Sequence, residues 1–160
     1  MSRATTDLCD AHGDHVRVVA TQFHDYGARH EFSGQITTIK VYEDNVLVRA
    51  ALEEPGQGRV LVVDGGASLR CALVGDIIAA LAHTNGWEGL IINGAIRDSA
   101  AIGAIDIGVK ALGTCPRRSA KQGQGQRDVP ISFGNVTVMP GEWLAADADG
   151  IVLAAEQLEG

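Results

Sequence analysis

The sequence predicts an α/β fold, a mixed sheet closed by a β-rich C-terminal layer, and three observations support this. Residues 59–64 (RVLVVD) form a continuous β-branched run, which is typical of a strand buried on both faces. A helical pattern over 76–85 and an apolar run over 89–93 follow, and together they make a right-handed, parallel strand–helix–strand unit. Residues 129–154 read as short strands separated by turn residues.

The N-terminal part predicts one helix over residues 4–24, opening at Thr5 or Thr6. Cys9, His12 and His15 on this segment suggest a metal cluster, but none of the usual zinc spacings is completed elsewhere. We therefore expect a polar helix with histidines on its surface. The apolar residues that it carries are Leu8, Val16, Val18 and Val19.

Two elements separate this segment from the central unit. Residues 33–42 alternate apolar and polar, as a half-buried strand does. A helix is predicted over 44–54, with Asp44 as its cap and the Pro55-Gly56 turn at its end.

The helix of the central unit has a predicted start and stop. Asp76 is expected to cap it and Gly86 to close it, while its apolar residues fall on one face. A further strand–helix element is expected around Ile107–Leu112. Within the C-terminal layer, turns are predicted at Gly134-Asn135, Pro140-Gly141 and Asp149-Gly150.

Length and composition indicate one globular domain. A chain of 160 residues with 46% apolar residues is long enough for a single core, and we assign residues 1–160 to it. No apolar run reaches the length of about 18 residues that spans a membrane, and the N-terminus lacks the apolar core of a signal peptide. The three cysteines are scattered, which fits a reducing compartment. We expect a cytoplasmic protein without a membrane partner.

The net charge of −7 argues against direct nucleic-acid binding, because that affinity comes largely from neutralising phosphates. The nearest approach to a basic tract lies in a Gly/Gln-rich loop and consists of Arg117, Arg118, Lys121 and Arg127. The acidic balance favours protein partners, or small ligands gathered into one local basic site.

The glycines after the strand 59–64 suggest a nucleotide or adenosyl-cofactor loop. Gly65-Gly66 completes neither the G-x-x-x-x-G-K-[ST] nor the G-x-G-x-x-G pattern, and its glycines are sparser than those of methyltransferases. We therefore expect a tight turn that needs positive φ.

The start of the helix at 76–85 is a candidate anion site, because the first backbone N–H groups of a helix lack partners and carry partial positive charge. Its first residues are Gly75, Asp76, Ile77 and Ile78. The alternative is that Asp76 alone satisfies these donors. Arg97 and Asp98, just beyond the strand at 89–93, are expected at the same sheet edge, where ligands of open α/β sheets bind.

The chemistry of this pair suits an anionic ligand and a cation. Arg97 would supply a bidentate fork for a carboxylate or an enolate oxygen. Asp98 would supply a hard oxygen ligand for Mg²⁺, which keeps most of its waters and needs few carboxylates. In the alternative interpretation, Asp98 caps the following turn and Arg97 extends into solvent.

These segments resemble the RraA family, named for regulators of ribonuclease E activity, which also contains class II 4-hydroxy-4-methyl-2-oxoglutarate aldolases. The resemblance covers nearly the whole chain, and its most specific part is the Gly-Asp loop followed by the Gly-x-x-Arg-Asp corner. The segments that carry it include FSGQITTIKVYEDN, GRVLVVDGGASLRCALVGDIIA, NGWEGLIINGAIRD and DIGVKALGTCPRRS.

The resemblance implies a swivelling β/β/α domain of the RraA-like type that forms a ring-shaped homotrimer. It implies that Arg97 binds the substrate, that Asp98 holds a divalent cation, usually Mg²⁺, and that both act in catalysis. Backbone donors would hold the carboxylate of a pyruvate-type 2-oxo acid, and these belong to Gly75, Asp76, Ile77 and Ile78.

The implied activity is cleavage of 4-hydroxy-4-methyl-2-oxoglutarate to two pyruvates, with oxaloacetate decarboxylation as a side activity. Both reactions pass through a pyruvate enolate that a metal and Arg97 would stabilise. A Schiff-base route would need a lysine with a lowered pKa, and Lys40 and Lys110 look like polar strand residues. The alternative function is a non-catalytic inhibitor that binds ribonuclease E.

One position departs from the family's pattern. The aldolases usually carry an acid three residues after the aspartate of the Arg-Asp corner, whereas this chain has Ala101. A group that orients metal-bound water is therefore missing, and weaker aldol cleavage is expected, while Asp98 keeps the metal site.

Overall fold

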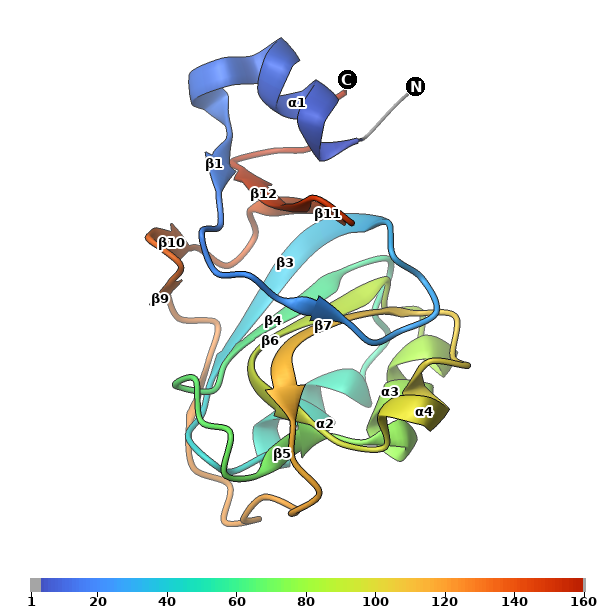
Figure 1. Cartoon of the computed structure of the whole chain (residues 1–160). Helices are drawn as coiled ribbons and strands as arrows, with labels where there is room; N and C mark the ends of the chain where they lie inside the picture. Colours follow the sequence, from blue (N-terminus) through green and yellow to red (C-terminus); the bar gives the residue numbers. More distant parts are fainter. Residues whose placement is uncertain (1–3, 160) are drawn as a thin grey trace.

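The computed structural model describes residues 4–159, and a parallel group of strands forms its centre (Figure 1). Helices and the C-terminal strands cover this group from opposite faces. The central strands are β3 (Phe32–Lys40), β4 (Val60–Asp64), β6 (Gly89–Ile96) and β7 (Gly108–Thr114), with β5 (Ala72–Val74) paired to the end of β6. The helices beside them are α2 (Val46–Leu52), α3 (Asp76–Thr84) and α4 (Ser99–Ile102).

The C-terminal layer is antiparallel and continues the same sheet. It consists of β11 (Trp143–Asp147), which pairs with β3, and β12 (Gly150–Ala154), while β9 (Ile131–Phe133) and β10 (Val136–Val138) form a separate hairpin. The short β8 (Gln126–Arg127) pairs with the end of β3. The predicted mixed sheet with a β-rich C-terminal layer is therefore confirmed.

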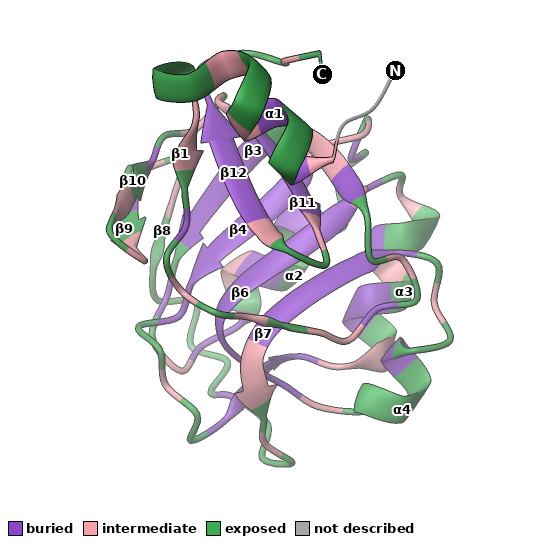
Figure 2. Cartoon of the chain, turned by 45° about the horizontal axis from the view of Figure 1, so that its top comes forward, coloured by how far each residue is buried: buried purple, intermediate pink, exposed green. Residues whose placement is uncertain are grey.

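The core follows from the alternation of side chains along the central strands. In β4, Leu61 and Val63 pack with α2 and α3, whereas Val60 and Val62 pack with the C-terminal layer. All residues of β4 are buried, as the continuous apolar run predicts. Figure 2 shows the central strands as largely buried and α1 (Thr5–His12) and α4 as mostly exposed.

The prediction of a helix over residues 4–24 is wrong beyond His12. Gly13 follows α1 with φ +51, and a single 3-10 turn, η1 (Gly13–His15), ends the helical segment. The valines that come next favour extended backbone because their branched side chains are restricted in a helix. Val19 is buried against the C-terminal layer, and its N–H donates to Ile151 O.

The extended segment after η1 supplies both outermost strands of the sheet. β1 (Arg17–Val18) pairs with β12, and β2 (His24–Asp25) pairs with β7. The strand order is β1-β12-β11-β3-β4-β6-β7-β2, so the N-terminal segment provides the strand at each end of the sheet. A buried ion pair secures β2, because Lys110 Nζ lies 3.0 Å from Asp25 Oδ1.

The two longer predicted helices exist with modified boundaries. α2 starts at Val46 and has Asn45 at its N-cap, so the predicted cap, Asp44, stands one residue too early, although its carboxylate accepts the Val46 N–H. The same carboxylate accepts the N–H groups of Gln122 and Gly123. Burial opposes the charged form of Asp44, but these backbone donors lower its pKa below the usual value.

The end of α3 is closed as the sequence predicts. Gly86 has φ +85, its N–H donates to His83 O, and the Trp87 N–H donates to Ala82 O. This pair of bonds is the Schellman arrangement, which glycine favours because it lacks a Cβ.

Two further predictions need correction. β6 continues past residue 93 to Ile96, with a register irregularity after Ile92. The expected strand–helix element around Ile107–Leu112 contains the strand β7 but no helix after it, because Gly113, Pro116 and a Gly/Gln-rich loop follow.

The C-terminal turns are close to the prediction. Gly134 and Asn135 have φ +57 and +62 and join β9 to β10, as in a two-residue hairpin turn. Gly141 has φ +86 in the Pro140-Gly141 turn. The last turn is Ala148-Asp149, and Gly150 is already the first residue of β12.

Among residues 4–159, no helix combines the length and apolar character needed to cross a membrane.

The Phe32 ring lies directly over two glycines of neighbouring strands. Gly89 of β6 pairs with Gly108 of β7, and a Cβ atom at either position would overlap the ring. The aromatic side chain therefore occupies space that two methyl groups would otherwise fill, which couples β3 to β6 and β7.

We predict that Gly108→Ala lowers the free energy of unfolding by about 2 kcal/mol, because a buried methyl group must force the Phe32 ring aside. Urea unfolding measures this loss. In Phe32→Leu/Gly108→Ala, the smaller side chain leaves room for the methyl group, so the combined loss should be smaller than the sum of the single losses. Strict additivity would contradict this packing.

Candidate anion-binding site

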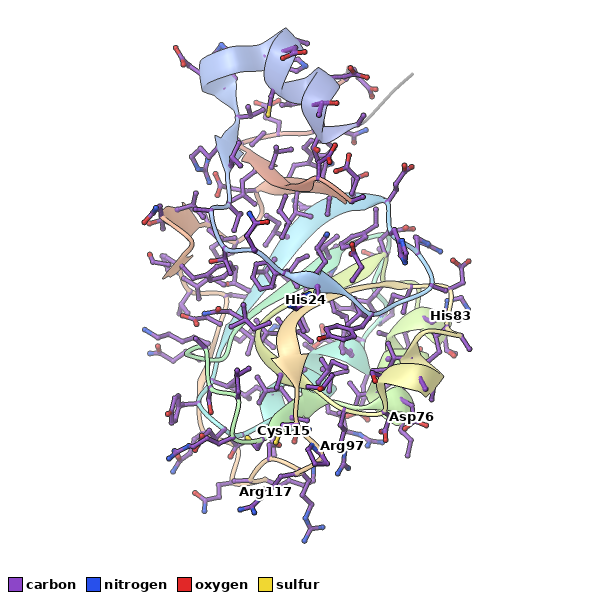
Figure 3. The ribbon with its side chains drawn as sticks, in the orientation of Figure 1. His24, Asp76, His83, Arg97, Cys115 and Arg117 are labelled. Carbon is purple, nitrogen blue, oxygen red and sulfur yellow. The ribbon has the colours of Figure 1, made fainter. Side chains whose placement is uncertain are left out.

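The candidate site lies where β5 leads into α3 and β6 leads into α4. The backbone N–H of Arg97 donates to Val74 O at 2.9 Å, which fixes the end of β6 beside the start of α3. In Figure 3, Arg97 and Asp76 are labelled near one another at the lower end of the molecule. The structure thus brings the two predicted loops together.

Gly75 allows this close approach because it has no side chain. A Cβ atom there would lie 2.7 Å from Asp98 Oδ2 and 3.5 Å from both Cγ and Nε of Arg97. Its φ of −118° is open to any residue, so the requirement is for space and not for an unusual backbone conformation. Glycine at position 75 is therefore what lets the Arg-Asp corner touch the helix end.

Asp98, and not Asp76, reaches the first amide of α3 from outside the helix. The Asp76 N–H donates to Asp98 Oδ2 at 3.2 Å, while Asp76 Oδ1 accepts only the adjacent Ile77 N–H, at 2.9 Å. Asp76 is itself the first residue of α3, so the prediction that it is the cap is wrong. Asp98 occupies the N-cap position of α4, as the alternative expects, but its side chain makes no capping bond there.

The backbone at Asp98 is unusual. Its φ of +56° lies in the left-handed region, which aspartate tolerates better than most side chains. This conformation turns the exposed carboxylate back toward α3 instead of toward α4. The negative charge then faces the positive end of the helix dipole.

The two isoleucines at the helix start differ in exposure. Ile77 is 69% exposed, whereas Ile78 is buried in the core beneath the helices. The first turn of α3 is therefore accessible on the side of Ile77 and anchored on the side of Ile78. A ligand can approach these backbone donors without moving the core.

The loop before β5 is held by a charged contact. The Arg70 guanidinium donates to both Glu43 oxygens at 2.7 Å, and the Ser68 hydroxyl donates to Glu43 Oε2 at 2.6 Å. Arg70 first, and then Ser68, lowers the pKa of Glu43 to about 2. Because Arg70 is largely exposed, salt weakens this contact.

The Gly65-Gly66 loop is a tight turn, as predicted. Gly66 has φ +66, and its N–H donates to Asp64 Oδ1, which also accepts from the Asn93 side chain. A Cβ at Gly65 would lie 2.9 Å from Asn93 O. One of the amides that a phosphate loop would present is thus already bound to Asp64.

Other reactive side chains have structural roles. Lys110 is buried, pairs with Asp25 and donates to Asp147 O at 2.8 Å, while Lys121 donates to Asn45 Oδ1 at 3.0 Å. Lys110 belongs to a strand, as expected, although it is buried. Burial raises the pKa of the Cys71 thiol, and Glu43 adds to the shift. The thiolate, the reactive form, is disfavoured there.

Asp98 is the residue at this corner that could hold a divalent cation. In the described part of the chain, no group of three or more His, Cys, Asp or Glu side chains is placed to hold a metal, which includes the segment with Cys9, His12 and His15. Mg²⁺ needs only one or two carboxylates and completes its shell with water and substrate oxygens. One exposed carboxylate beside an arginine is compatible with that mode of binding.

A mixed α/β sheet brings a helix N-terminus, an arginine and an aspartate together at one corner, which makes this corner of an α/β protein a candidate site for a small anion. The chain belongs to the RraA-like family, whose model, described as Aldolase/RraA, matches residues 5–153.

Sequence relatives extend over nearly the whole chain. A protein of Alkalilimnicola ehrlichii, provisionally named a 4-hydroxy-4-methyl-2-oxoglutarate aldolase, is 54% identical over 158 residues, covering 99% of this chain and 98% of the relative. A protein of Aromatoleum aromaticum with the same provisional name is also 54% identical, with 99% of each chain covered.

Two solved structures share the fold closely. A Geobacillus kaustophilus protein, described as S-adenosylmethionine: 2-dimethylmenaquinone methyltransferase, has a TM-score of 0.96 at 53% identity, covering 97% of this chain and 96% of its own. The RNA-processing inhibitor RraA from Thermus thermophilis also has a TM-score of 0.96, at 44% identity, covering 100% of this chain and 97% of its own.

We predict that Gly75→Ala weakens Mn²⁺ binding at least about tenfold, because the new methyl group displaces the Asp98 carboxylate. Isothermal titration calorimetry measures this change. Gly113→Ala is the matched control, since its Cβ would meet only Leu69 Cδ2 at 3.7 Å, an ordinary contact. Equal Mn²⁺ affinity in the two variants would show that the space at Gly75 is irrelevant to the site.

Proposed function

We propose that this protein is a divalent-metal-dependent lyase that cleaves 4-hydroxy-4-methyl-2-oxoglutarate into two pyruvates and decarboxylates oxaloacetate as a side activity. The convergence of Arg97 and Asp98 on Gly75, at the start of α3, carries this proposal. The names of relatives that are 54% identical over almost the full chain support the aldolase assignment.

The chain's own groups account for binding of the 2-oxo acid end. The carboxylate of the substrate accepts backbone N–H groups from the first turn of α3, where the helix dipole favours negative charge. A substrate carboxylate that takes the Asp76 N–H replaces Asp98 Oδ2 there and leaves this oxygen for a cation. The Arg97 guanidinium lies over Gly75 and orients the 2-oxo group.

A divalent cation, held by Asp98 together with water and substrate oxygens, would supply Lewis-acid polarisation of the 2-oxo group. Cleavage breaks the bond between C3 and C4, and its electron pair passes to the C2 oxygen as pyruvate enolate. Arg97 stabilises that negative charge by hydrogen bonding. The C4 hydroxyl gives up its proton as the second pyruvate forms, and the enolate takes a proton at C3.

Oxaloacetate fits the same scheme because loss of CO₂ leaves its electron pair in the same position. The bond between C3 and the departing carboxylate breaks, and pyruvate enolate forms again. The site therefore needs no additional group for decarboxylation.

We predict that Arg97→Ala lowers kcat for pyruvate release from oxaloacetate by roughly 10²–10³-fold, since one donor to the developing oxyanion is lost. Asp98→Ala should lose activity to a similar extent and no longer respond to added Mg²⁺. A coupled lactate dehydrogenase assay, with Mg²⁺ and then with chelator, measures both effects. Absence of turnover, or turnover unchanged in Asp98→Ala, would overturn the lyase proposal.

In this proposal, the alanine at position 101 makes aldol cleavage weaker than in relatives that carry an acid there. It is exposed in the single turn of α4, three residues after Asp98. We predict that Ala101→Asp raises kcat for aldol cleavage several-fold by adding an acid that orients metal-bound water. Ala100→Asp, which adds the same charge one residue earlier, is the control. An equal response of both variants would indicate a general charge effect.

We propose a second function, inhibition of ribonuclease E by protein binding, on the basis of the 44% identity to a structure described as the RNA-processing inhibitor RraA. The net charge of −7 suits a basic surface on the partner. We predict that the immobilised protein retains purified ribonuclease E in low salt. Failure to recover a complex, with a known RraA as positive control, would contradict this function.

We also propose the ring-shaped homotrimer implied by the family resemblance. A solution mass of 16.8 kDa, that of one chain, would refute it.

A further inference from the structure

Three arginines without a carboxylate partner gather at the end of the sheet that carries the candidate site. Within residues 4–159, Arg97, Arg117 and Arg118 make no ion pair. Arg17, Arg29, Arg70 and Arg127 are paired with acids. In the same part of the chain, Arg49 and Arg59 make no ion pair either, but Arg49 lies on α2 and the Arg59 guanidinium is stacked on the Trp87 ring. In a protein of net charge −7, this group forms a local concentration of unpaired positive charge.

All three arginines are attached to β5 through the backbone. The Ala72 N–H donates to Arg117 O at 2.7 Å, and Arg118 forms a β-bridge with Ala72. Val74, whose carbonyl accepts the Arg97 N–H, stands two residues farther along the strand, roughly 7 Å away. Figure 3 shows Arg97 and Arg117 at the same lower end of the molecule, with Cys115 labelled nearby.

The segment that carries Arg117 and Arg118 is fixed at both ends. Before it, the Cys115 N–H donates to Ile96 O at 3.0 Å. After it, Ser119 is buried, and the Ala120 N–H donates to Glu43 O at 2.9 Å. Because the backbone of this segment is already fixed, a ligand that binds the two exposed guanidinium groups orders little additional chain.

Three positively charged side chains attached to one short strand, without acidic partners, favour a bound anion. The first turn of α3 and Arg97 take one carboxylate in the proposed lyase reaction. A 2-oxo acid with a five-carbon backbone carries its second carboxylate four C–C bonds from the first, and the exposed side chains of Arg117 and Arg118 can extend from their attachment beside Ala72 toward that group. Arginine binds carboxylates through paired N–H donors.

We propose that Arg117 and Arg118 form a second carboxylate subsite, which selects 2-oxo acids with a distal carboxylate over those with one carboxylate only. The inference rests on the proposed binding of the 2-oxo acid end at α3 and Arg97. It adds the residues that determine which 2-oxo acids are preferred.

Calorimetric titration with two uncleavable probes tests this subsite in the presence of Mg²⁺. The native protein should bind 2-oxoglutarate about tenfold more tightly than pyruvate, because charged hydrogen bonds hold its second carboxylate. In Arg117→Gln/Arg118→Gln, 2-oxoglutarate affinity should fall about tenfold, while the affinity for pyruvate changes less than about twofold. Arg49→Gln, an exposed arginine on α2, is the charge control and should leave the preference for 2-oxoglutarate intact.

Several outcomes would overturn the subsite. These are equal affinity of the native protein for both probes, binding of neither, an unchanged preference in the double variant, or a parallel loss for both probes. The lyase proposal is judged separately by pyruvate release from oxaloacetate. A protein that shows the predicted preference in binding but no turnover would retain the subsite and lose the lyase reaction.

Discussion

The contact between the Asp98 carboxylate and the first amide of α3 holds the candidate site together. It joins the end of β6 to the start of a helix that precedes it in the chain. The contact needs a left-handed backbone at Asp98 and a residue without Cβ at Gly75, because any side chain there would push the carboxylate away. A negative group at the positive end of a helix is favourable, so the corner is stable by itself and is also receptive to a competing anion.

Electrostatics distinguishes this corner from the rest of the protein. The chain is acidic overall, and many of its basic side chains are neutralised locally, as Arg127 is by Glu54 and Lys110 by Asp25. Arg97, Arg117 and Arg118 lack such partners and are attached to β5, so positive charge gathers there. An anion is favoured at such an edge of an otherwise acidic protein, which is the electrostatic basis of the proposed substrate site.

The parts of the fold that could be predicted from the sequence are those with strong local signals. β4 was recognisable because burial on both faces requires an unbroken apolar run, and the end of α3 because Gly86 can adopt positive φ. The prediction of a long N-terminal helix is wrong because the spacing of its valines fits a helical pattern. The burial of these side chains depends on strands that are distant in the sequence, which a local pattern does not report. The meeting of the Arg-Asp corner with the start of α3 was predicted from the order of the elements, but the bond from the Asp76 N–H to Asp98 was not, since no local pattern reports which amide a carboxylate will accept.

Both margins of the ten-stranded sheet are occupied by two-residue strands from a single stretch of chain. Exposed strand edges invite pairing with other molecules, and here β1 and β2 shield the two that this sheet would otherwise present. The N-terminal segment therefore limits the strand edge that the sheet offers for β-pairing with other molecules. Its removal would uncover the edges of β12 and β7, and it would also take Val19 out of the core and Asp25 away from the buried Lys110.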